Sequence, residues 1–232
     1  MDEKIVSDVI EWDSVNWAKF LDFIDEAGMD FQGKRVLALG ERNGGMSLFF
    51  ALKGAEVLCS DLDGPTDEAH VLHKKYGVQS KIRYAAIDAV HIPSEYDSQF
   101  DVVTFKSVLG GIGRNNNYEL QEQCVGSIYR VLKEKGMCIF ADNMRGSSFH
   151  RLLRKLFVPW GGTWHYETDE EVRVLFSRFR LIKTHKFGVL GTLGRSEPQR
   201  RALGTLDTMV FDKVFPDTSK YIGAYIFQKQ AE

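Results

Sequence analysis

Apolar runs alternate with amphipathic stretches along most of the chain, and glycine or proline separates many of them. Val36-Leu37-Ala38-Leu39, for example, is a short run without polar alternation, as expected of a strand that is covered on both faces. We expect strands at residues 36–39, 55–60, 81–87, 100–106, 137–141, 181–189 and 221–228. We expect helices at residues 14–28, 46–52, 64–76, 118–132, 147–157, 168–178 and 200–214. Strands that alternate with helices of this length predict an α/β fold with a doubly wound, mostly parallel sheet.

The stretch between residues 36 and 63 carries the strongest signal, because a glycine turn joins its first strand to a helix. Gly40 ends the strand, and Gly44-Gly45 follow after three polar residues, of which Asn43 is expected to cap the helix. Asp61 lies at the carboxyl end of the second strand, on the edge where an open α/β sheet binds its ligand. A carboxylate about 20 residues beyond such a turn is placed to accept hydrogen bonds from ribose hydroxyls.

The glycine turn also indicates which kind of nucleoside it suits. A dinucleotide fingerprint needs glycine at the position that Arg42 occupies here, because backbone must approach a pyrophosphate there. A phosphate-binding P-loop would need Gly-Lys-Ser/Thr, which is absent from the chain. The turn therefore favours a nucleoside without phosphates, and the alternative is a purely structural strand–helix–strand turn.

At this point the sequence resembles the class I S-adenosylmethionine-dependent methyltransferases. The run VLALGERNGG is similar to the first motif of that family, and Asp61 matches the acid on its second strand. Arg42 departs from the family, which usually has glycine there. The resemblance implies a Rossmann-like, seven-stranded sheet with an antiparallel C-terminal strand. It also implies one methyltransferase domain over residues 1–232, with a helical extension at 1–32 and an insertion at 191–220.

The resemblance further implies that S-adenosyl-L-methionine is the cofactor. Asp88 sits where an acid of the family contacts the adenine amino group, although a strand-end turn cap is the alternative for this residue. Arg42 or Lys106 is a candidate to meet the methionine carboxylate. The residues expected to bind the cofactor are Gly40, Glu41, Arg42, Gly44, Asp61, Leu62, Asp88 and Ala89.

The composition of the chain limits the partners and the compartment that we expect for this protein. The 232 residues are 44% hydrophobic and 27% charged with a net charge of −2, which gives no global attraction to nucleic acid or to an anionic membrane. Cys59, Cys124 and Cys138 are scattered and apolar in context, so we expect reduced core thiols in a cytoplasmic protein. No secretion signal and no membrane-spanning run is visible.

Transfer of a methyl group to a hydroxyl benefits from a base within hydrogen-bond reach. His165 is a candidate because it lies in a loop with Trp160, Trp164 and Tyr166, although that loop is equally well explained as one pinned by its tryptophans. Lys106, at the end of the fourth strand, is a second candidate that would orient or activate the acceptor. Among the other histidines, we expect His70 and His73 on a solvated helix face and His91 beside the cofactor pocket.

The pair Asp142-Asn143 resembles the metal ligands of magnesium-dependent catechol-type O-methyltransferases. Those enzymes have a further aspartate where this chain has Lys106, and an ammonium group repels a divalent ion. We therefore expect no metal and interpret Asp142-Asn143 as lining of the pocket. A metal site is the alternative.

Two groups of basic residues suggest an anionic acceptor, such as a nucleotide-linked or lipid-linked sugar, although solvated helix faces would look the same. They are Arg145, Arg151, Arg154 and Lys155 in one group and Arg195, Arg200 and Arg201 in the other. The sequence thus predicts an O-methyltransferase acting on a small-molecule or glycan-type acceptor, as in polysaccharide biosynthesis, and no nucleic-acid partner. The alternatives are an NAD(P)-dependent oxidoreductase and a non-catalytic module that binds S-adenosylmethionine.

Overall fold

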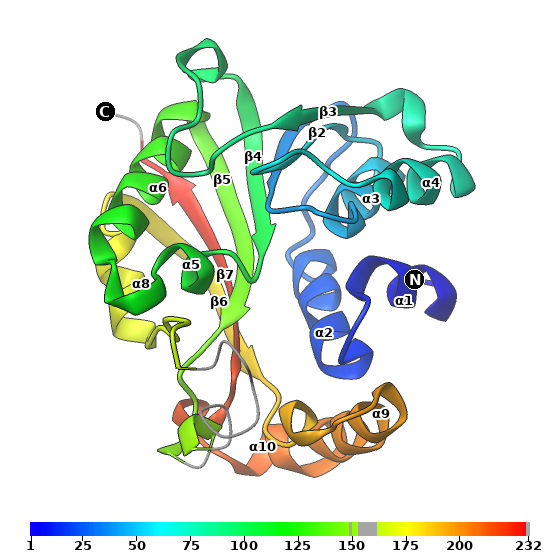
Figure 1. Cartoon of the computed structure of the whole chain (residues 1–232), viewed down its shortest axis with the longest axis vertical. Coiled ribbons are helices and arrows are strands. Elements are labelled where there is room, and N and C mark those ends of the chain that lie inside the picture. The colour runs from blue at the N-terminus through cyan, green and yellow to red at the C-terminus, as the bar shows by residue number, and fades with distance from the viewer. Residues whose placement is uncertain (149, 153–161, 231–232) are drawn as a thin grey trace.

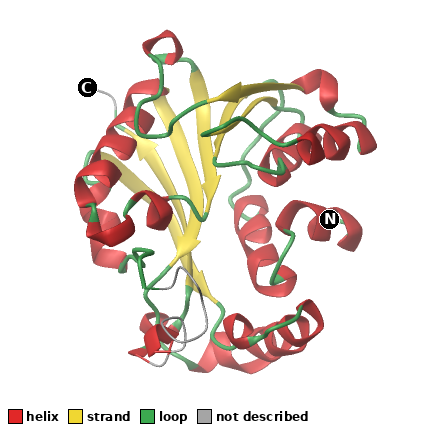
Figure 2. Cartoon of the chain, in the orientation of Figure 1, coloured by secondary structure: helices red, strands yellow, loops and turns green. Residues whose placement is uncertain are grey.

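A seven-stranded sheet runs through the centre of the computed structural model, which describes residues 1–148, 150–152 and 162–230 (Figures 1 and 2). The strand order is β3-β2-β1-β4-β5-β7-β6. The strands are β1 (Arg35–Leu39), β2 (Glu56–Asp61), β3 (Ile82–Ala86), β4 (Phe100–Lys106), β5 (Leu132–Asn143), β6 (Phe179–Phe187) and β7 (Ile222–Lys229). All neighbouring pairs are parallel except those that include β7, which runs antiparallel to both β5 and β6. The predicted α/β class and the antiparallel C-terminal strand are confirmed.

Helices cover both faces of the sheet, as an apolar strand pattern requires (Figure 1). On one face lie α1 (Glu3–Ile10), α2 (Ser14–Asp25), α3 (Gly45–Leu52) and α4 (Asp67–Lys75). On the other face lie α5 (Leu109–Ile112), α6 (Tyr118–Val131) and α8 (Asp169–Leu175). Each face has its own apolar core, and the three cysteines are buried and unbridged within these cores.

The predicted insertion forms a separate group of helices beyond the carboxyl ends of β4 and β5 (Figure 1). It contains α9 (Glu197–Leu206), a π-helical turn η5 (Asp207–Phe211) and a short helix α10 (Asp212–Val214). Helix α9 packs against α2, so a segment of the N-terminal region meets the insertion at this edge of the sheet.

Several local predictions were wrong or incomplete. Helix α1 was not predicted at all, although Asp2 caps it by accepting a hydrogen bond from the amide of Lys4. The N-cap of α2 is Asp13, which has a left-handed φ of 46°. A capping box between Thr168 and Glu171 starts α8. Residues 149 and 153–157 of the helix predicted at 147–157 lie outside the described residues.

Candidate functional site

The candidate site lies where the strand order reverses, between β1 and β4. Helices reach these two strands from opposite faces, so the loops after the strands diverge and leave a crevice at their carboxyl ends. The register pairs Leu39 with Phe105, which places Gly40 beside Lys106 at the rim of this crevice. The first motif and the end of the fourth strand, far apart in the sequence, therefore share one site.

Glycine is required at two positions of the loop after β1. Gly40 has a φ of +64°, and a Cβ there would lie 2.5 Å from a methyl group of Val108. Gly44 has a φ of +77°, and a Cβ there would lie 2.5 Å from Cε1 of His73. Gly44 itself precedes α3, so the predicted cap by Asn43 is wrong. The Asn43 side chain instead bonds Glu11 and Thr66.

Arg42 does not distort this loop, because its φ is not positive and its side chain is exposed. The amide of Arg42 donates to Oδ2 of Asp61 at 2.9 Å, and the amide of Leu62 donates to Oδ1 at 2.8 Å. Each carboxylate oxygen of Asp61 therefore keeps a free lone pair, which matches the two donor hydroxyls of a ribose. The Leu62 side chain is exposed on the same rim.

Asp88 and Ala89 follow β3 on the neighbouring part of the rim. The Asp88 carboxylate accepts hydrogen bonds from the amide of Val90 at 2.9 Å and from Nδ1 of His91 at 3.0 Å. It thus caps the turn, as the alternative interpretation stated, and still leaves 43% of its side chain exposed. His91 is 71% exposed, so its ring lies at the surface of this rim.

Glu41 and Lys106 bring opposite charges to a cavity of about 60 Å³ at the centre of the crevice. The other residues that line it are Val9, Glu11, Gly40, Arg42, Asn43, Gly45 and Met46. Oε2 of Glu41 accepts a hydrogen bond from the amide of Ser47 at 2.7 Å, and burial raises the pKa of Glu41 to about 7. The Glu41 carboxylate on this wall suits a cationic group such as the amino group at the methionine end of the cofactor.

The ammonium group of Lys106 lies between two tryptophan rings. Its Nζ is 5.8 Å from the ring centroid of Trp12 and 5.2 Å from that of Trp17, distances typical of cation–π contacts. Burial lowers the pKa of Lys106, and the nearby carboxylates of Glu11, Glu41 and Asp142 offset this only in part. The sequence around Trp12 did not predict the contact of its ring with Lys106.

The insertion holds the tryptophan segment in place. The carboxylate of Glu197 on α9 accepts hydrogen bonds from the amides of Asp13 and Ser14, both at 2.9 Å, and from Oγ of Ser14 at 2.8 Å. The guanidinium of Arg200, one turn further on, lies 5.9 Å from the ring centroid of Trp12. The segment with Trp12 and Asp13 and the start of α9 thus form one side of the site together. They are far apart in the sequence, since 184 residues separate Asp13 from Glu197.

The carboxyl end of β5 adds Asn143 beside the end of β4. Nδ2 of Asn143 donates to Oγ of Ser107 at 2.6 Å, and Ser107 has a φ of 58°, which is unusual for a residue other than glycine. The interpretation of Asp142 as pocket lining was wrong. Its side chain is fully buried and accepts hydrogen bonds from the amides of Val108, Leu109 and Asn143.

Burial raises the pKa of Asp142 to about 6, while the amide hydrogen bonds work in the opposite direction. The role of this carboxylate is to hold the loop after β4 against β5. Within the described residues, no group of three or more His, Cys, Asp or Glu side chains is placed to hold a metal ion.

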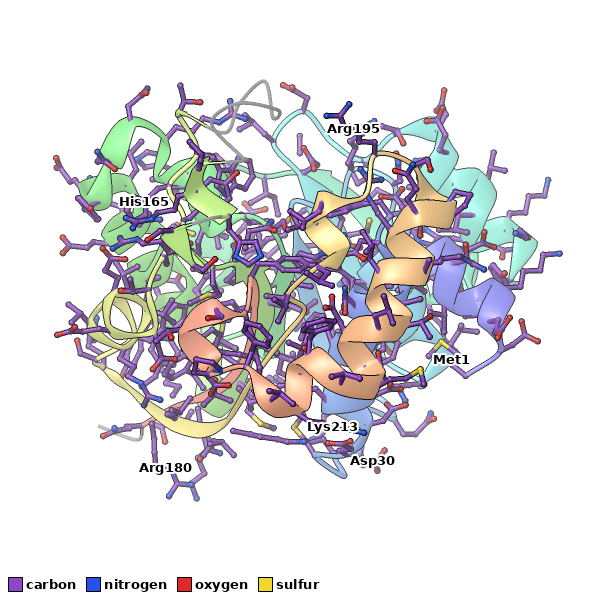
Figure 3. All side chains as sticks on the ribbon, turned by 90° about the horizontal axis from the view of Figure 1, so that it is seen from below. Met1, Asp30, His165, Arg180, Arg195 and Lys213 are labelled. Carbon is purple, nitrogen blue, oxygen red and sulfur yellow. The ribbon has the colours of Figure 1, made fainter. Side chains whose placement is uncertain are left out.

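His165 lies on the face of the sheet that carries α6 and α8, on the opposite side of the molecule from Met1 when the structure is seen from below (Figure 3). Its side chain is 5% exposed, and its Nδ1 lies 3.1 Å from Oδ1 of Asn116. Tyr118 packs edge-on against the ring, and Glu171 lies 3.9 Å from Nε2. The structure thus does not bring His165 into contact with the residues that line the Glu41–Lys106 cavity.

The basic residues have partners that the sequence did not reveal. Arg145 forms a bidentate pair with Glu171, at 2.8 and 2.9 Å. Arg201 is exposed on α9, and Arg195 lies at the turn before that helix (Figure 3). Arg154, Lys155 and Trp160 lie outside the described residues.

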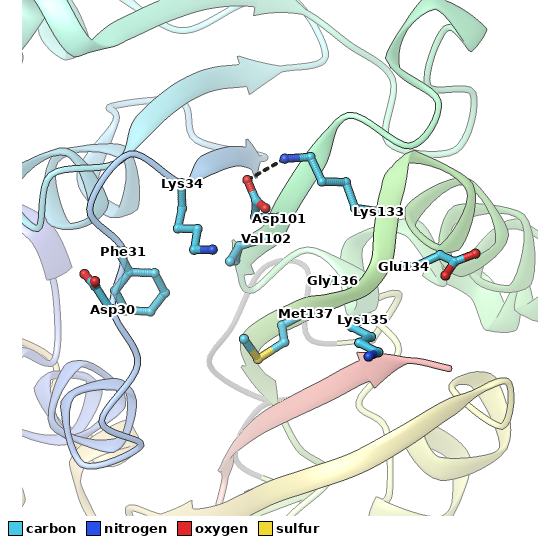
Figure 4. A pocket seen from close by; sticks show the side chains of 10 residues that line it. All are labelled: Asp30, Phe31, Lys34, Asp101, Val102, Lys133, Glu134, Lys135, Gly136 and Met137. Carbon is cyan, nitrogen blue, oxygen red and sulfur yellow. Dashed lines mark hydrogen bonds and ion pairs between the residues drawn. The ribbon is translucent and has the colours of Figure 1, made fainter. Parts of the chain in front are cut away.

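A second cavity, of about 210 Å³, lies at the opposite edge of the sheet (Figure 4). Its walls come from the amino end of β4, with Asp101, and from the first residues of β5, with Lys133. These two side chains form an ion pair at 2.8 Å. Because parallel sheets bind ligands at their carboxyl ends, this cavity is not part of the candidate site.

Comparisons with known proteins agree with this geometry. Residues 37–140 match the family described as methyltransferase domain, which confirms the predicted class I S-adenosylmethionine-dependent methyltransferase. No curated protein matches the sequence. No helix among the described residues is long and apolar enough to cross a membrane.

Three solved structures illustrate the shared fold. The YcgJ protein from Bacillus subtilis is 16% identical with a TM-score of 0.66, over 93% of this chain and 99% of that one. An S-adenosylmethionine-dependent methyltransferase from Methanosarcina mazei is 19% identical with a TM-score of 0.62, over 90% and 98% of the two chains. Phosphoethanolamine N-methyltransferase 2 from Haemonchus contortus, in complex with S-adenosylmethionine, is 18% identical with a TM-score of 0.65, over 93% and 53%.

Proposed function

We propose that this chain, an S-adenosylmethionine-dependent methyltransferase, moves the methyl group to a hydroxyl of a small-molecule or glycan-type acceptor. The observation that carries the proposal is that Lys106 lines the same cavity as the glycine loop and Glu41. A titratable amine thereby lies beside the place expected for the methyl donor. An acceptor hydroxyl, unlike an amine that reacts as its free base, must lose a proton as the new bond forms, and an amine of lowered pKa can take it.

The residues present fit the cofactor in charge and in shape. Glu41 would hold the amino group of its methionine end, with Gly40, Arg42 and Gly44 forming the loop beneath. Asp61 would accept hydrogen bonds from the ribose, beside Leu62. Asp88 and Ala89 would border the adenine. When bound, the cofactor supplies an activated methyl group on a sulfonium, which a nucleophile displaces in line.

We expect the end of α1 and the residue after it, from Val9 to Glu11, to move when the cofactor enters. The cavity of about 60 Å³ has room for only a few water molecules, far less than a nucleoside needs. Val9 and Glu11 form its outer wall, and the backbone of Val9 packs directly on Gly45. We expect this wall to swing outward while the β1 and β4 ends stay in place.

In the transfer itself, Nζ of Lys106 would take the proton of the acceptor hydroxyl, and the cofactor would supply the methyl group to the acceptor oxygen. The positive charge of the sulfonium close by would lower the pKa of Lys106 further, which favours the free amine before transfer. Transfer leaves the sulfur neutral and places the proton on Lys106, so that charge is conserved. Holding the two reactants in line is expected to supply about 7–11 kcal/mol of the barrier.

His165 remains the other predicted base. Its contacts with Asn116 and Tyr118 support a role in fixing the loop between Thr163 and Thr168, and burial lowers the pKa of His165. We therefore assign the proton transfer to Lys106, and His165 stabilises the loop between Thr163 and Thr168.

We propose further that the acceptor is anionic. Arg200 lies over Trp12 at the edge of the crevice, and Arg195 and Arg201 belong to the same insertion. An arginine that stacks on an indole ring presents the edge of its guanidinium to a ligand, which suits a phosphate or carboxylate. Trp12 would supply an apolar face for a sugar or aromatic ring.

The test combines binding with turnover. Titration calorimetry with S-adenosylhomocysteine should give heat, whereas NADH should give none; the reverse result would support the NAD(P)-dependent oxidoreductase. Transfer of labelled methyl groups to a panel of hydroxyl and amine acceptors should then favour anionic hydroxyl compounds. Binding of the cofactor without transfer to any acceptor would support the non-catalytic module, and transfer only to amines would contradict the proposed O-methylation.

A further inference from the structure

The buried histidine of α4 touches the glycine loop. His73 was predicted on a solvated helix face, but its side chain is fully buried, and only its neighbour His70 is exposed. Nε2 of His73 lies 2.9 Å from the carbonyl oxygen of Gly44, and Nδ1 lies 2.8 Å from the hydroxyl of Tyr84 on β3. The ring thus bridges the loop and the sheet.

The two partners determine which ring nitrogen carries the proton. A carbonyl oxygen only accepts hydrogen bonds, so Nε2 must donate to Gly44. Nδ1 is then free to accept the hydroxyl proton of Tyr84. Burial lowers the pKa of His73, which is consistent with a neutral ring of this tautomer.

The carbonyl oxygen of Gly44 accepts two hydrogen bonds that fix the conformation of the loop. The same oxygen accepts the first helical hydrogen bond of α3, from the amide of Leu48 at 2.9 Å. With the His73 bond, both lone pairs are used and the plane of the peptide after Gly44 is fixed. The direction of the first free amides of α3, which face the crevice from the helix end, is fixed with it.

The start of α4 holds the two preceding loop residues. The amide of Thr66 donates to the carbonyl of Arg42 at 2.8 Å, and Oγ1 of Thr66 donates to Oδ1 of Asn43 at 2.9 Å. Residues 42 to 44 are therefore held from outside by one helix. The chain has Arg42 where the family usually has glycine, and the two hydrogen bonds from Thr66 fix the conformation of the loop at this point.

We propose that His73 is a positioning residue of the methyl-transfer reaction: its donor to Gly44 presets the glycine loop for S-adenosylmethionine. It acts through Gly44 and not by contact with the reacting atoms. The proposal deepens the proposed function and rests on it, since it concerns the same cofactor site.

Two substitutions separate the hydrogen bond from the filling of space. His73→Leu keeps the volume and removes the donor, and we expect its affinity for S-adenosylhomocysteine in calorimetry to fall about tenfold. His73→Gln restores an N–H donor, and its affinity should stay within about threefold of the parent. The exposed residue Lys74 provides the matched control, because Lys74→Leu changes the same helix and should leave the affinity unchanged.

Turnover gives the second measurement. For His73→Leu, the KM for S-adenosylmethionine should rise about as much as the Kd, while kcat at saturating cofactor changes little. A purely structural residue would lower the active fraction, which reduces kcat and leaves the KM of the remaining enzyme unchanged. That pattern would overturn the proposal.

Nitrogen NMR of the parent chain tests the bond without any substitution, and so applies even if His73→Leu does not fold. The His73 ring should be neutral with its proton on Nε2 between pH 7 and pH 8, because burial lowers its pKa. A proton on Nδ1, or a charged ring in that range, would overturn the proposal, and so would equal affinities of the parent and His73→Leu. If the unsubstituted protein gives no heat with S-adenosylhomocysteine, the proposed function itself is overturned, and the proposed role of His73 with it.

Discussion

The donor side and the acceptor side that we propose for the crevice are built in different ways. On the donor side, the residues from Arg35 to Leu62 form one continuous strand–helix–strand unit, and backbone amides hold its key carboxylate, Asp61. On the acceptor side, side chains from distant segments meet: Trp12, Lys106 and Arg200 come from the N-terminal segment, β4 and the insertion. The donor side is therefore local and the acceptor side is not.

This difference has a physical consequence for specificity. Backbone hydrogen bonds within one unit persist through many changes of side chain, so the fold of such a unit can stay constant among proteins that are only 16–19% identical. Side-chain contacts between distant segments, such as the contact between Trp12 and Arg200, are lost by a single substitution. The acceptor side is thus where such proteins can differ in substrate, and the following substitutions compare the two sides.

The largest effect is expected at Lys106. Lys106→Met keeps the apolar stem between the two tryptophans but removes the base, so kcat should fall about 100-fold or more. Because the amine must be unprotonated to take the proton, the parent rate should rise with pH up to the lowered pKa of Lys106, and this rise should disappear in the variant. Single-turnover rates measured from pH 6 to pH 10 check both points.

Lys106→Arg is the matched control, because it keeps the charge but cannot lose its proton at these pH values. If Lys106→Arg is nearly as active as the parent, Lys106 supplies charge and is not the base.

Next in size is the loss of affinity expected at Asp61. In Asp61→Asn the charged acceptor becomes a neutral amide, and S-adenosylhomocysteine should bind about 10- to 100-fold more weakly. Calorimetry checks the change, with the neighbouring exposed carboxylate as control, since Asp63→Asn should bind as the parent does. Equal affinities of Asp61→Asn and the parent would disprove the ribose assignment.

The insertion should matter for stability. Glu197→Ala removes three hydrogen bonds to the start of α2 and should lower the free energy of unfolding in urea by about 1–3 kcal/mol. Partial burial acts to raise the pKa of Glu197, but hydrogen bonds from Ser14 and Asp13 outweigh it and lower the pKa. The stabilisation is therefore complete above the ordinary value of 4.5 and is lost as the pH falls through the lower folded-state value.

The control for this measurement is Glu122→Ala, on the exposed face of α6. A difference between parent and Glu197→Ala that persists unchanged in acid would show that the hydrogen bonds to Glu197 do not cause it.

A smaller effect is expected at the second candidate base. His165→Ala should lower kcat by less than about tenfold, because it loosens the loop against Asn116 without removing the proton acceptor. Steady-state rates of this variant and of Lys106→Met, measured side by side, compare the two candidates directly. A loss at His165 as large as the one at Lys106 would restore the histidine as the base.

The smallest effect is expected where the sequence departs from the family. Arg42→Gly should change the Kd for S-adenosylhomocysteine less than about threefold, because the Arg42 side chain is exposed and its amide remains able to bond Asp61. Calorimetry on this variant measures the change. A tenfold gain would mean that the arginine does obstruct the loop.

The sequence by itself determined the order of strands and helices, the glycine loop and the acid at the end of β2. These features depend on hydrogen bonds and periodicities within a few residues, and such local preferences can be read directly from a run such as 36–61. Lys106 ends an apolar run of the same kind, so its position at the carboxyl end of β4 also follows from the sequence.

Only the tertiary structure decided what each polar side chain does there. It placed His73 under Gly44, buried Asp142 beneath the loop after β4, and joined Glu197 to Asp13 across the chain. Whether a polar residue is exposed or buried depends on what packs against it, and those partners lie up to 184 residues away in the sequence. Non-local burial leaves no periodic signal, which is why the strands and the glycine loop could be predicted and the contacts of Lys106, Asp142 and Glu197 could not.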